Sequence, residues 1–380
     1  MKIFVVGAGA FGAWIALSLC RIGHQVTLVD HLGPANDKSS SAGESRIIRS
    51  AYGADEIYSV MARRSLQLWM DFFRKENHSE YFRQTGVLWM AQADERTVWR
   101  SKDTLERLDI KHDWLDAYAI AERYPQFTVH SDTVALFEPE GGALLAERSI
   151  QAVVAAAVRA GVTYERAEIR APVLTSNRLT SLEAADGRGF SADLFVFACG
   201  SWLPKLFDVL TNVIRPTRQD VFFFAVPEAV DHVREGRLPI WVDQREPSIA
   251  YGFPDLGTGL KLGFHRLGTA FDPDAPRQET GPREIAGATD YLAQHLASMR
   301  GAEIKATHVC HYENTQNGDF LIDLHPGTDN VWLVGGGSGH GFKHAPAIAE
   351  YVCNAIGGAG IREARFSLAA KQNVMGGRVL

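Results

Sequence analysis

Residues 3–30, IFVVGAGAFGAWIALSLCRIGHQVTLVD, decide the fold of this chain. A short β-branched run at the start is typical of a buried parallel strand, and a glycine-rich turn, an apolar helix and a second strand follow it. Gly7, Gly9 and Gly12 fit the pattern G-x-G-x-x-G. The first glycine permits a tight turn, the second lets the backbone approach a pyrophosphate, and the third lets the helix pack on the strand.

The acidic residue Asp30 falls at the end of the second strand, where a carboxylate can hold a ribose hydroxyl. The helix that opens after the glycines presents free backbone N–H groups to phosphates. The strand, the turn, the helix and the acid therefore agree on a dinucleotide-binding fold. This motif does not separate NAD from FAD, and a glycine-rich turn without a ligand is the alternative.

Length and composition bound the protein class. A chain of 380 residues is long enough for two domains, and its net charge of −6 comes without a long run of either sign. This balance argues against nucleic acid or an anionic membrane as the main partner. The four cysteines show no metal-ligand spacing, so we expect free thiols, no metal and a reduced, cytoplasmic compartment. The early glycines would interrupt a signal-peptide core, so we interpret the N-terminus as folded protein.

The strand, glycine turn and helix pattern returns near the C-terminus, and a buried strand before a glycine occurs mid-chain. We therefore predict a mixed α/β (α+β) protein with a Rossmann-like nucleotide-binding domain made of residues 1–84, 146–216 and 310–380. Residues 85–145 and 217–309 carry aromatic and alternating patterns, which predict an inserted substrate domain with a mainly antiparallel sheet. This organisation suits a flavoenzyme better than a plain NAD dehydrogenase.

Two predicted strands of the inserted domain carry residues able to do chemistry. In residues 259–265, alternation places Lys261, Gly263 and His265 on one face. That face either lines a site or is solvated, and residue type alone favours solvent for a lysine. In the preceding strand, Tyr251 is read as an aromatic of the core or of the sheet surface.

Three more segments hold candidates. Arg46 and Arg49 would share a face if they lie on one helical turn, and could grip a carboxylate or phosphate or form surface ion pairs. Lys343 follows a glycine run just where a helix begins, an unfavourable place for a cation unless an anion is near. In an extended segment Cys310 and Tyr312 share a face, and residue type alone indicates a buried, inert thiol for Cys310.

Seven motifs together resemble one family, the monomeric sarcosine oxidases and N-methyltryptophan oxidases of the D-amino-acid-oxidase-like FAD enzymes. They occur in the family's order along nearly the whole chain: GAGAFG (7–12), SRIIRSAYG (45–53), YGFP (251–254), LKLGFH (260–265), VCHYENT (309–315), DFLIDLHP (319–326) and GSGHGFKHAP (337–346).

The resemblance implies roles for the residues at matching positions. FAD would be bound by the N-terminal fold and attached through its 8α-methyl group to Cys310. Lys261 would stand over the flavin and assist its reaction with oxygen, while Arg49 and Lys343 would hold the substrate carboxylate. The remaining matches are to residues beside the flavin or the substrate: Arg46, Gly339, Gly341, Tyr251, Tyr312 and His265.

The implied reaction is oxidation of a secondary α-amino acid such as sarcosine to an imine, which hydrolyses, with O2 reduced to H2O2. The family further implies a monomer whose partners are a small amino acid and O2. One departure stands out, because Ser41 and Ala42 replace a pair of histidines usual in these relatives. Trp241 and Val242 match pocket-facing positions that vary among members.

The alternatives that keep the fold are a fructosyl-amino-acid oxidase, a cyclic imino-acid oxidase, and an amino-acid dehydrogenase with another electron acceptor. An NAD(P)-dependent dehydrogenase and a flavin-binding protein without turnover are the more distant ones.

Overall fold

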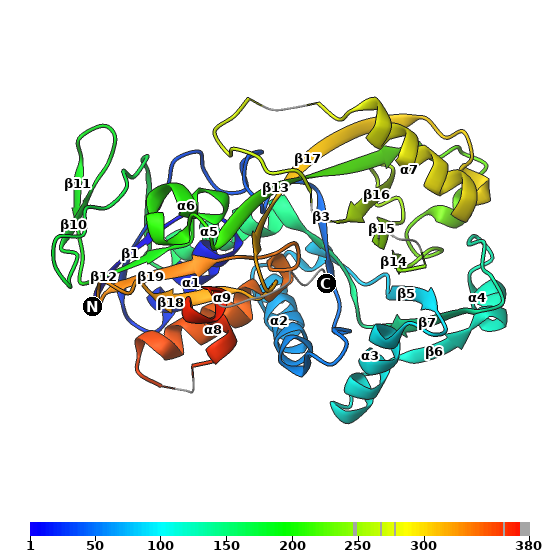
Figure 1. Cartoon of the computed structure of the whole chain (residues 1–380), viewed down its shortest axis with the longest axis horizontal. Helices are drawn as coiled ribbons and strands as arrows, with labels where there is room; N and C mark the ends of the chain where they lie inside the picture. Colours follow the sequence, from blue (N-terminus) through cyan, green and yellow to red (C-terminus); the bar gives the residue numbers. More distant parts are fainter. Residues whose placement is uncertain (246–248, 267, 277–278, 360–361, 373–380) are drawn as a thin grey trace.

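The computed structural model describes residues 1–245, 249–266, 268–276, 279–359 and 362–372. Two regions, each built around its own large sheet, lie side by side (Figure 1). One holds a six-stranded, mainly parallel sheet, and the other holds an eight-stranded, mainly antiparallel sheet. This architecture confirms the mixed α/β fold predicted from the sequence.

The six-stranded sheet has the order β18-β19-β12-β1-β2-β9. Its first five strands from the β9 edge pair in parallel, and β18 is antiparallel to β19. They come from the start, middle and end of the chain: β1 (Lys2–Val6), β2 (Gln25–Asp30), β9 (Thr163–Arg166), β12 (Leu194–Phe197), β18 (Leu321–Leu324) and β19 (Val331–Gly335). The order confirms a Rossmann-like sheet.

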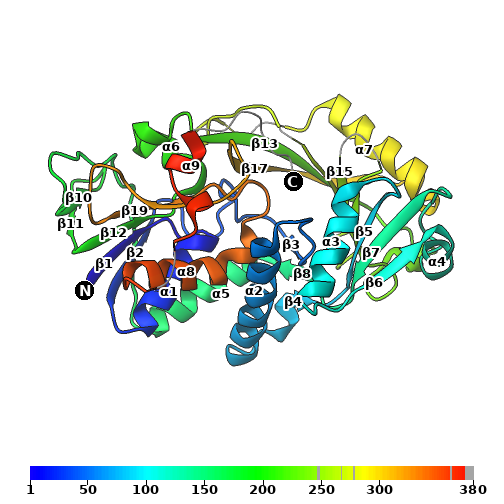
Figure 2. The same cartoon turned by 60° about the horizontal axis from the view of Figure 1, so that its bottom comes forward.

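Alternation along β1 explains how this sheet is covered on both faces. Ile3 and Val5 enter the core shared with the helices, whereas Phe4 and Val6 enter the core of the opposite face. Figure 2 shows the helices lying together along one face of the sheet. They are α1 (Ala10–Arg21), α2 (Glu56–Lys75), α5 (Ala146–Arg159) and α8 (Ala345–Ile356).

The eight-stranded sheet has the order β17-β13-β16-β15-β14-β5-β7-β6, and all its pairs are antiparallel except β14 with β5. Helices α4 and α7 pack on one face and α3 on the other. The elements are β5 (Val87–Gln92), α3 (Arg96–Arg107), β6 (Asp113–Asp116), α4 (Ala117–Arg123), β7 (Thr133–Glu138), β13 (Ile214–Phe224), β14 (Ile240–Asp243), β15 (Ile249–Phe253), β16 (Leu260–His265), α7 (Pro282–His295) and β17 (Ile304–Thr315).

Strands β13 and β17 pair along their whole length and run across the predicted domain boundaries at residues 216/217 and 309/310. The division into two domains with those boundaries stays a prediction. The smaller elements are a three-stranded sheet of β3 (Ser45–Ile48), β8 (Gly142–Leu145) and β4 (Phe82–Arg83), a hairpin of β10 (Ser181–Glu183) and β11 (Gly189–Ser191), and the short helices α6 (Leu203–Leu206) and α9 (Ala369–Gln372).

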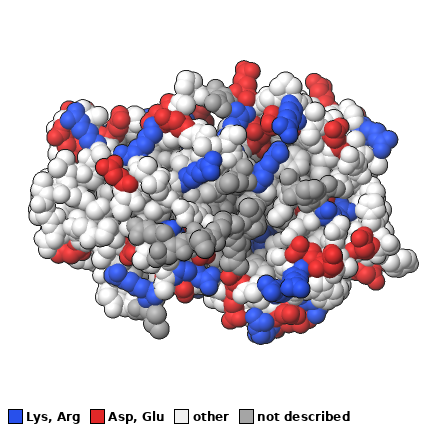
Figure 3. All heavy atoms as spheres, in the orientation of Figure 1, with Lys and Arg blue, Asp and Glu red and all other residues white. Residues whose placement is uncertain are grey.

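Acidic and basic side chains are interspersed over the face shown in Figure 3, as the small net charge leads one to expect. Within the described part of the chain, no helix combines the length and the apolar character needed to cross a membrane.

Candidate active site

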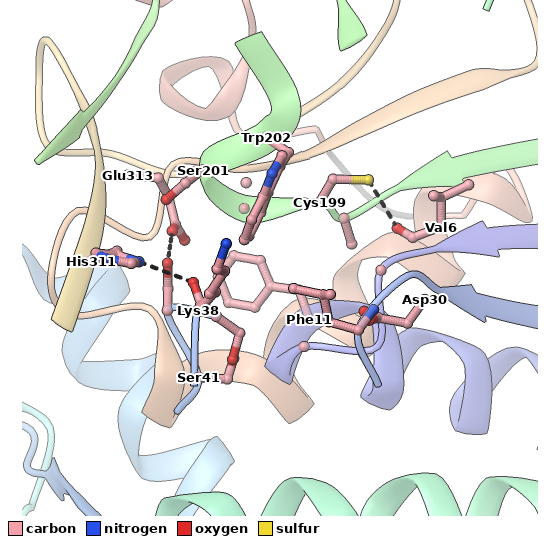
Figure 4. Close-up of a pocket in the computed structure, with 18 of the residues that line it drawn as sticks. Val6, Phe11, Asp30, Lys38, Ser41, Cys199, Ser201, Trp202, His311 and Glu313 are labelled. Atoms are coloured by element: carbon pink, nitrogen blue, oxygen red, sulfur yellow. Dashed lines mark hydrogen bonds between the residues drawn. The ribbon is translucent and has the colours of Figure 1, made fainter. Parts of the chain in front are cut away.

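A cavity of about 420 Å³ opens at the carboxyl ends of the parallel strands, which is where open α/β sheets bind ligands. Figure 4 shows Asp30 at one end of it and Glu313 at the other, with Phe11 and Ser41 between them. The glycine-rich turns after β1 and β19 supply part of its wall. We call the five glycines Gly7, Gly9, Gly12, Gly339 and Gly341 the cradle.

The N-terminal glycines of the cradle are required by contact distances. Gly7 has φ +101°, and an added Cβ there would lie 2.4 Å from the carbonyl oxygen of Ala198. At Gly12 an added Cβ would lie 1.8 Å from the carbonyl oxygen of Gly7, and at Gly9 it would lie 3.2 Å from Ser41 Oγ. The backbone turn and the start of α1 can therefore approach each other, and a ligand, only without side chains.

The C-terminal glycines make room for Tyr312 of β17, Phe11 of α1 and the backbone of their own turn. An added Cβ at Gly339, where φ is +78°, would meet the ring of Tyr312 at 2.5 Å. At Gly341 it would lie 2.8 Å from both Gly337 Cα and the ring of Phe11. Of the cradle, all but Gly12 line the cavity, and Gly12 supports the turn from behind.

Asp30 lines the cavity and braces the turn around it. One carboxylate oxygen accepts from the backbone N–H of Ala8 at 2.8 Å, and the other accepts from Leu32 and Gly33 at 2.9 and 2.7 Å. Burial raises the pKa of Asp30, and these hydrogen bonds oppose that rise. Its predicted contact with a ribose stays a prediction.

Arg46 also lines the cavity, but the reason given for its pairing with Arg49 was wrong. Residues 45–48 form strand β3 rather than a helical turn, because they pair with β8 in a sheet. The spacing therefore does not place the two side chains on one face. The guanidinium of Arg46 donates to the carbonyl oxygens of Ser45, at 2.9 Å, and of Ser40, at 3.2 Å, which ties the loop before β3 to the cavity wall.

Lys261 is buried, with 4% of its surface exposed, so the solvated alternative for its strand face was wrong. The predicted alternation of side chains along β16 is confirmed, since Leu260 and Leu262 enter the core on the other face of the strand. Lys261 Nζ donates to the carbonyl and hydroxyl oxygens of Ser45 at 2.8 and 3.1 Å and lies 4.5 Å from the ring centre of Phe253. Burial, with the nearby charge of Arg46, lowers the pKa of Lys261 to about 7.

Arg49 lies between two aromatic faces, 4.8 Å from the ring centre of Tyr52 and 4.3 Å from that of Trp89. Its guanidinium donates to the carbonyl oxygen of Ala51. The buried carboxylate of Glu138 accepts from the backbone N–H groups of Ser50 and Ala51, and its charge reaches Arg49. Aromatic faces and a carbonyl hold the cation without neutralising it.

Lys343 is buried just before α8, in the short helix Phe342–His344, close to the predicted helix start. Its Nζ contacts the hydroxyl of Tyr52 at 2.7 Å and the carbonyl oxygen of His340 at 3.1 Å. Burial, followed by the charge of Arg49, lowers the pKa of Lys343 well below its ordinary value. Arg49, Lys261 and Lys343 are here called the cation cluster, and within the described residues none of the three forms an ion pair with a carboxylate.

The two tyrosines are neighbours, and each influences the pKa of the other. Burial raises the pKa of both, that of Tyr312 to about 12, so both are neutral at pH 7. Gly263 gives the Tyr251 ring its space, because an added Cβ would lie 2.5 Å from it. The ring of His265 lies 5.9 Å from that of Tyr312, and burial lowers its pKa to about 4, which keeps it uncharged.

Cys310 is half-buried on β17, opposite Gln219 of β13, and is a free thiol. It lies close enough to Lys261, Tyr251 and Tyr312 to interact electrostatically with each of them. It does not line the cavity directly. Its attachment to a flavin stays a prediction.

The pocket-facing interpretation of Trp241 was wrong. Trp241 is fully buried in the core under α7, and its indole N–H donates to the Tyr291 hydroxyl at 3.2 Å. Its neighbour Val242 lies on the other face, with Tyr251. Successive residues of a strand point to opposite faces, so only one of the two can share the face of Tyr251.

The structure thus brings most predicted residues into two adjoining groups. Arg46, Asp30, Tyr312 and four cradle glycines line the cavity, and the cation cluster, Tyr251, His265 and Cys310 lie behind Arg46 and Tyr312. Sequence reasoning missed several polar residues that contact them: the half-buried Ser40 and the buried Tyr52, Glu138, Glu313, His340 and His344. Most of these stand inside motifs that were quoted, so their positions were available, but nothing in the sequence showed that they are buried.

The residues of the cavity fit an FAD cofactor. The glycine turn leads into the N-terminus of α1, where backbone N–H groups can meet phosphates, and Asp30 stands at the end of β2. The glycines of the cradle keep this turn narrow and free of side chains, because an added Cβ at several of its positions would clash with neighbouring protein atoms.

Comparisons with known proteins point the same way. The family described as "DAO: FAD dependent oxidoreductase" matches residues 2–355. Monomeric sarcosine oxidase of Bacillus sp. strain B-0618 is 34% identical over 364 residues, covering 92% of this chain and 90% of the relative. N-methyl-L-tryptophan oxidase of Yersinia pestis strain Pestoides F is 27% identical over 361 residues, covering 92% of each.

Among solved structures, L-proline dehydrogenase from P. horikoshii superposes with a TM-score of 0.83, at 20% identity, over 97% of this chain and 96% of that one. At this identity the likeness shows the fold alone. The family match and the sarcosine oxidase relative carry the assignment, and this chain belongs to the DAO family of FAD-dependent oxidoreductases.

Proposed function

We propose that this enzyme oxidises the C–N bond of a secondary α-amino acid such as sarcosine to an imine that hydrolyses, with O2 reduced to H2O2. One observation carries the proposal. Arg49 and Lys343 are cations at a buried site, and their described contacts are a phenol, carbonyls and aromatic faces rather than a carboxylate. The charge of Glu138 reaches both cations, but it forms no ion pair with either of them. A buried cation without an ion-pair partner is costly, so such a site favours an incoming anion.

The anion in question is the substrate carboxylate. Arg49 and Lys343 hold it with charge-assisted hydrogen bonds and so fix the adjacent nitrogen and carbon. Tyr251 and Tyr312 line the approach as neutral side chains, and His265 adds no charge because its pKa lies near 4. The chemistry that bound FAD supplies is acceptance of two electrons from the substrate and their delivery to oxygen.

Lys261 acts on the oxygen side of the reaction. It is held by Ser45, not by a carboxylate, so its charge is available to stabilise negative charge that develops on oxygen. Arg46, fixed to the cavity wall by carbonyl groups, adds a second positive charge beside it.

A peroxide assay in air tests the function. We expect H2O2 from sarcosine or another N-methyl or cyclic amino acid, and bleaching of the yellow colour by the same compound without oxygen. Proline, pipecolate and fructosyl-glycine belong in the same panel. Bleaching without peroxide would show a dehydrogenase with another acceptor, and the absence of bleaching by every amine would overturn the proposal.

We further propose that Cys310 attaches the flavin through a thioether to its 8α-methyl carbon. The bond replaces the thiol hydrogen and one methyl hydrogen, and the two electrons and two protons released would reduce O2 to H2O2. Its support is the match of VCHYENT to the family motif and the position of Cys310 beside Lys261 and Tyr312. Acid precipitation gives a yellow pellet if the link exists, and Cys310→Ser moves the colour to the supernatant. A yellow supernatant from the unchanged protein would refute the link. The monomeric state and the cytoplasmic location stay predictions.

A further inference from the structure

Tyr52 lies where β3 leads into α2 and is 4% exposed. It contacts both Arg49 and Lys343, the two residues predicted to hold the substrate carboxylate. Its ring centre is 4.8 Å from the Arg49 guanidinium, and its hydroxyl is 2.7 Å from Lys343 Nζ. The same hydroxyl lies 2.9 Å from His344 Nε2 and 3.4 Å from His340 Nδ1. One phenol therefore connects four polar side chains.

The hydrogen-bond directions around this hydroxyl follow from its neighbours. His340 Nε2 lies 3.0 Å from the carbonyl oxygen of Gly318, which can only accept, so Nε2 carries the proton. Burial lowers the pKa of His340, so the ring is neutral and its Nδ1 is an acceptor. The Tyr52 hydroxyl is the group that donates to it, at the long distance of 3.4 Å.

Because the Tyr52 hydroxyl donates its hydrogen bond to His340, both lone pairs of its oxygen are left to accept hydrogen bonds. Lys343 Nζ donates to one of them, and His344 Nε2–H donates to the other. His344 is also neutral, because burial lowers its pKa, and its Nδ1 is then the unprotonated nitrogen. That Nδ1 is buried and has no partner among the described residues, which suits an acceptor better than an N–H donor. The hydrogen-bonding capacity of the hydroxyl is filled.

This arrangement has a consequence for Lys343. A phenol and a carbonyl oxygen fix the direction of its Nζ without cancelling its charge, whereas a carboxylate in place of Tyr52 would neutralise it. At the same time the face of the Tyr52 ring stabilises Arg49. The spacing of the two cations is therefore set through one rigid side chain.

We propose that Tyr52 is a positioning residue that orients Lys343 and Arg49 for the substrate carboxylate, with His340 and His344 fixing its hydroxyl. The proposal rests on the function proposed above and adds a determinant of carboxylate recognition. It makes Tyr52 act through the two cations, not on the reacting bond.

Tyr52→Phe tests it, because the ring stays and only the hydroxyl is lost. For sarcosine we expect KM to rise by about tenfold, the size of one charge-assisted hydrogen bond, with kcat changed by less than about threefold. For sarcosinamide, which lacks the carboxylate, KM should rise far less. Calorimetric titration with acetate gives a readout independent of turnover, and its Kd should rise by about the same factor as KM.

Tyr58→Phe is the matched control. Tyr58 is also a fully buried tyrosine, its ring lies 5.4 Å from that of Tyr52, and its hydroxyl donates to Asp319 at 2.7 Å. It should lose stability and keep both KM and the preference for sarcosine over sarcosinamide. His344→Leu is the second variant, in case Tyr52→Phe does not fold. It removes one of the three bonds and should shift KM in the same direction by less.

A double-mutant cycle separates positioning from general damage. Adding Tyr52→Phe to Lys343→Met should raise KM for sarcosine by less than about twofold, since the partner is already absent. Equal KM changes in Tyr52→Phe and Tyr58→Phe, or additive effects in the cycle, would overturn the inference. If the unchanged enzyme neither oxidises sarcosine nor binds acetate, the proposed function fails instead.

Discussion

The cradle and the cation cluster adjoin each other but are built on different physics. The cradle is fixed by steric exclusion, because at Gly7, Gly12 and Gly339 an added Cβ would overlap another atom within 2.5 Å. In the cation cluster the hydrogen bonds of Lys261 and Lys343 are ordinary in length, and what is unusual is that these positive charges are buried with neutral partners. Substitutions in the cradle should therefore abolish cofactor binding, whereas substitutions in the cation cluster should leave the cofactor bound and change rate constants or KM.

The largest effect is expected from Gly12→Val. Its Cβ would lie 1.8 Å from the carbonyl oxygen of Gly7, which belongs to the backbone of the turn and cannot move aside cheaply. We expect the purified protein to be colourless, as measured by the flavin absorbance per mole of protein.

Gly287→Ala is the control for a glycine replacement. Gly287 lies within α7, and an added Cβ meets nothing within 4 Å. This variant should keep its flavin and gain about 0.5–1 kcal/mol in the free energy of unfolding, because alanine is the better helix former. Full flavin content in Gly12→Val would show that the cradle does not form the cofactor wall.

The second effect concerns Lys261→Met. We expect the rate constant for reoxidation of the reduced enzyme by O2 to fall by about 10²-fold or more, as when one charge stabiliser is removed from a developing oxyanion. Stopped-flow absorbance after anaerobic reduction measures it. Flavin reduction by substrate in the same instrument is the internal control and should change much less.

The pH dependence of the reoxidation rate tests the same role of Lys261. Burial lowers the pKa of Lys261 to about 7, so the ammonium is present below that pH and lost above it. In the unchanged enzyme, reoxidation should slow as the pH rises from about 6 to about 8, and the step should be absent in Lys261→Met. A rate that rises with pH, or a step that survives the substitution, would remove Lys261 from this role.

These two regions also differ in how far the sequence predicts them. The cradle follows from local rules, since a strand, spaced glycines and a helix suffice to place Gly7, Gly9 and Gly12. In the same way, the helical periodicity of residues 56–75 predicts a helix, and α2 spans these residues. The order of motifs along the chain identified the family, and the match over residues 2–355 confirms it.

The cation cluster could not be derived from local rules. Arg49 and Lys343 come from the end of β3 and the turn before α8, and only the folded chain brings them together. Lys261 comes from β16 and is brought beside Arg46 in the same way. Residue type favoured solvent for Lys261, and helical spacing was wrongly assumed for Arg46 and Arg49. In both cases a tertiary contact decided the outcome: Ser45 receives Lys261, and β8 holds residues 45–48 as a strand.

The third effect is smaller and tests the cluster on the substrate side. Lys343→Met should raise KM for sarcosine by about 10- to 100-fold, the range of one hydrogen bond to a buried charge. Its folding should suffer little, because a buried cation is replaced by an apolar chain of similar length. Steady-state kinetics with sarcosine and sarcosinamide measure the loss, which should be confined to sarcosine. An equal loss for both would show that Lys343 does not read the carboxylate.

The smallest effect is expected at Ser41, beside the cradle. Its Oγ accepts the backbone N–H of Ala10 at 2.9 Å, in the first turn of α1, and no side chain of the helix does so. Ser41→Ala should therefore lower the free energy of unfolding by about 1 kcal/mol, the usual cost of a lost helix cap, while Ser41→Thr retains most of it. Denaturant unfolding measures both. The loss of unfolding free energy should be smaller with flavin bound, because a phosphate at the helix N-terminus can accept the hydrogen bond of the freed backbone N–H. An identical loss with and without flavin would mean that the cofactor does not reach the N–H of Ala10, and that Ser41 serves the fold alone.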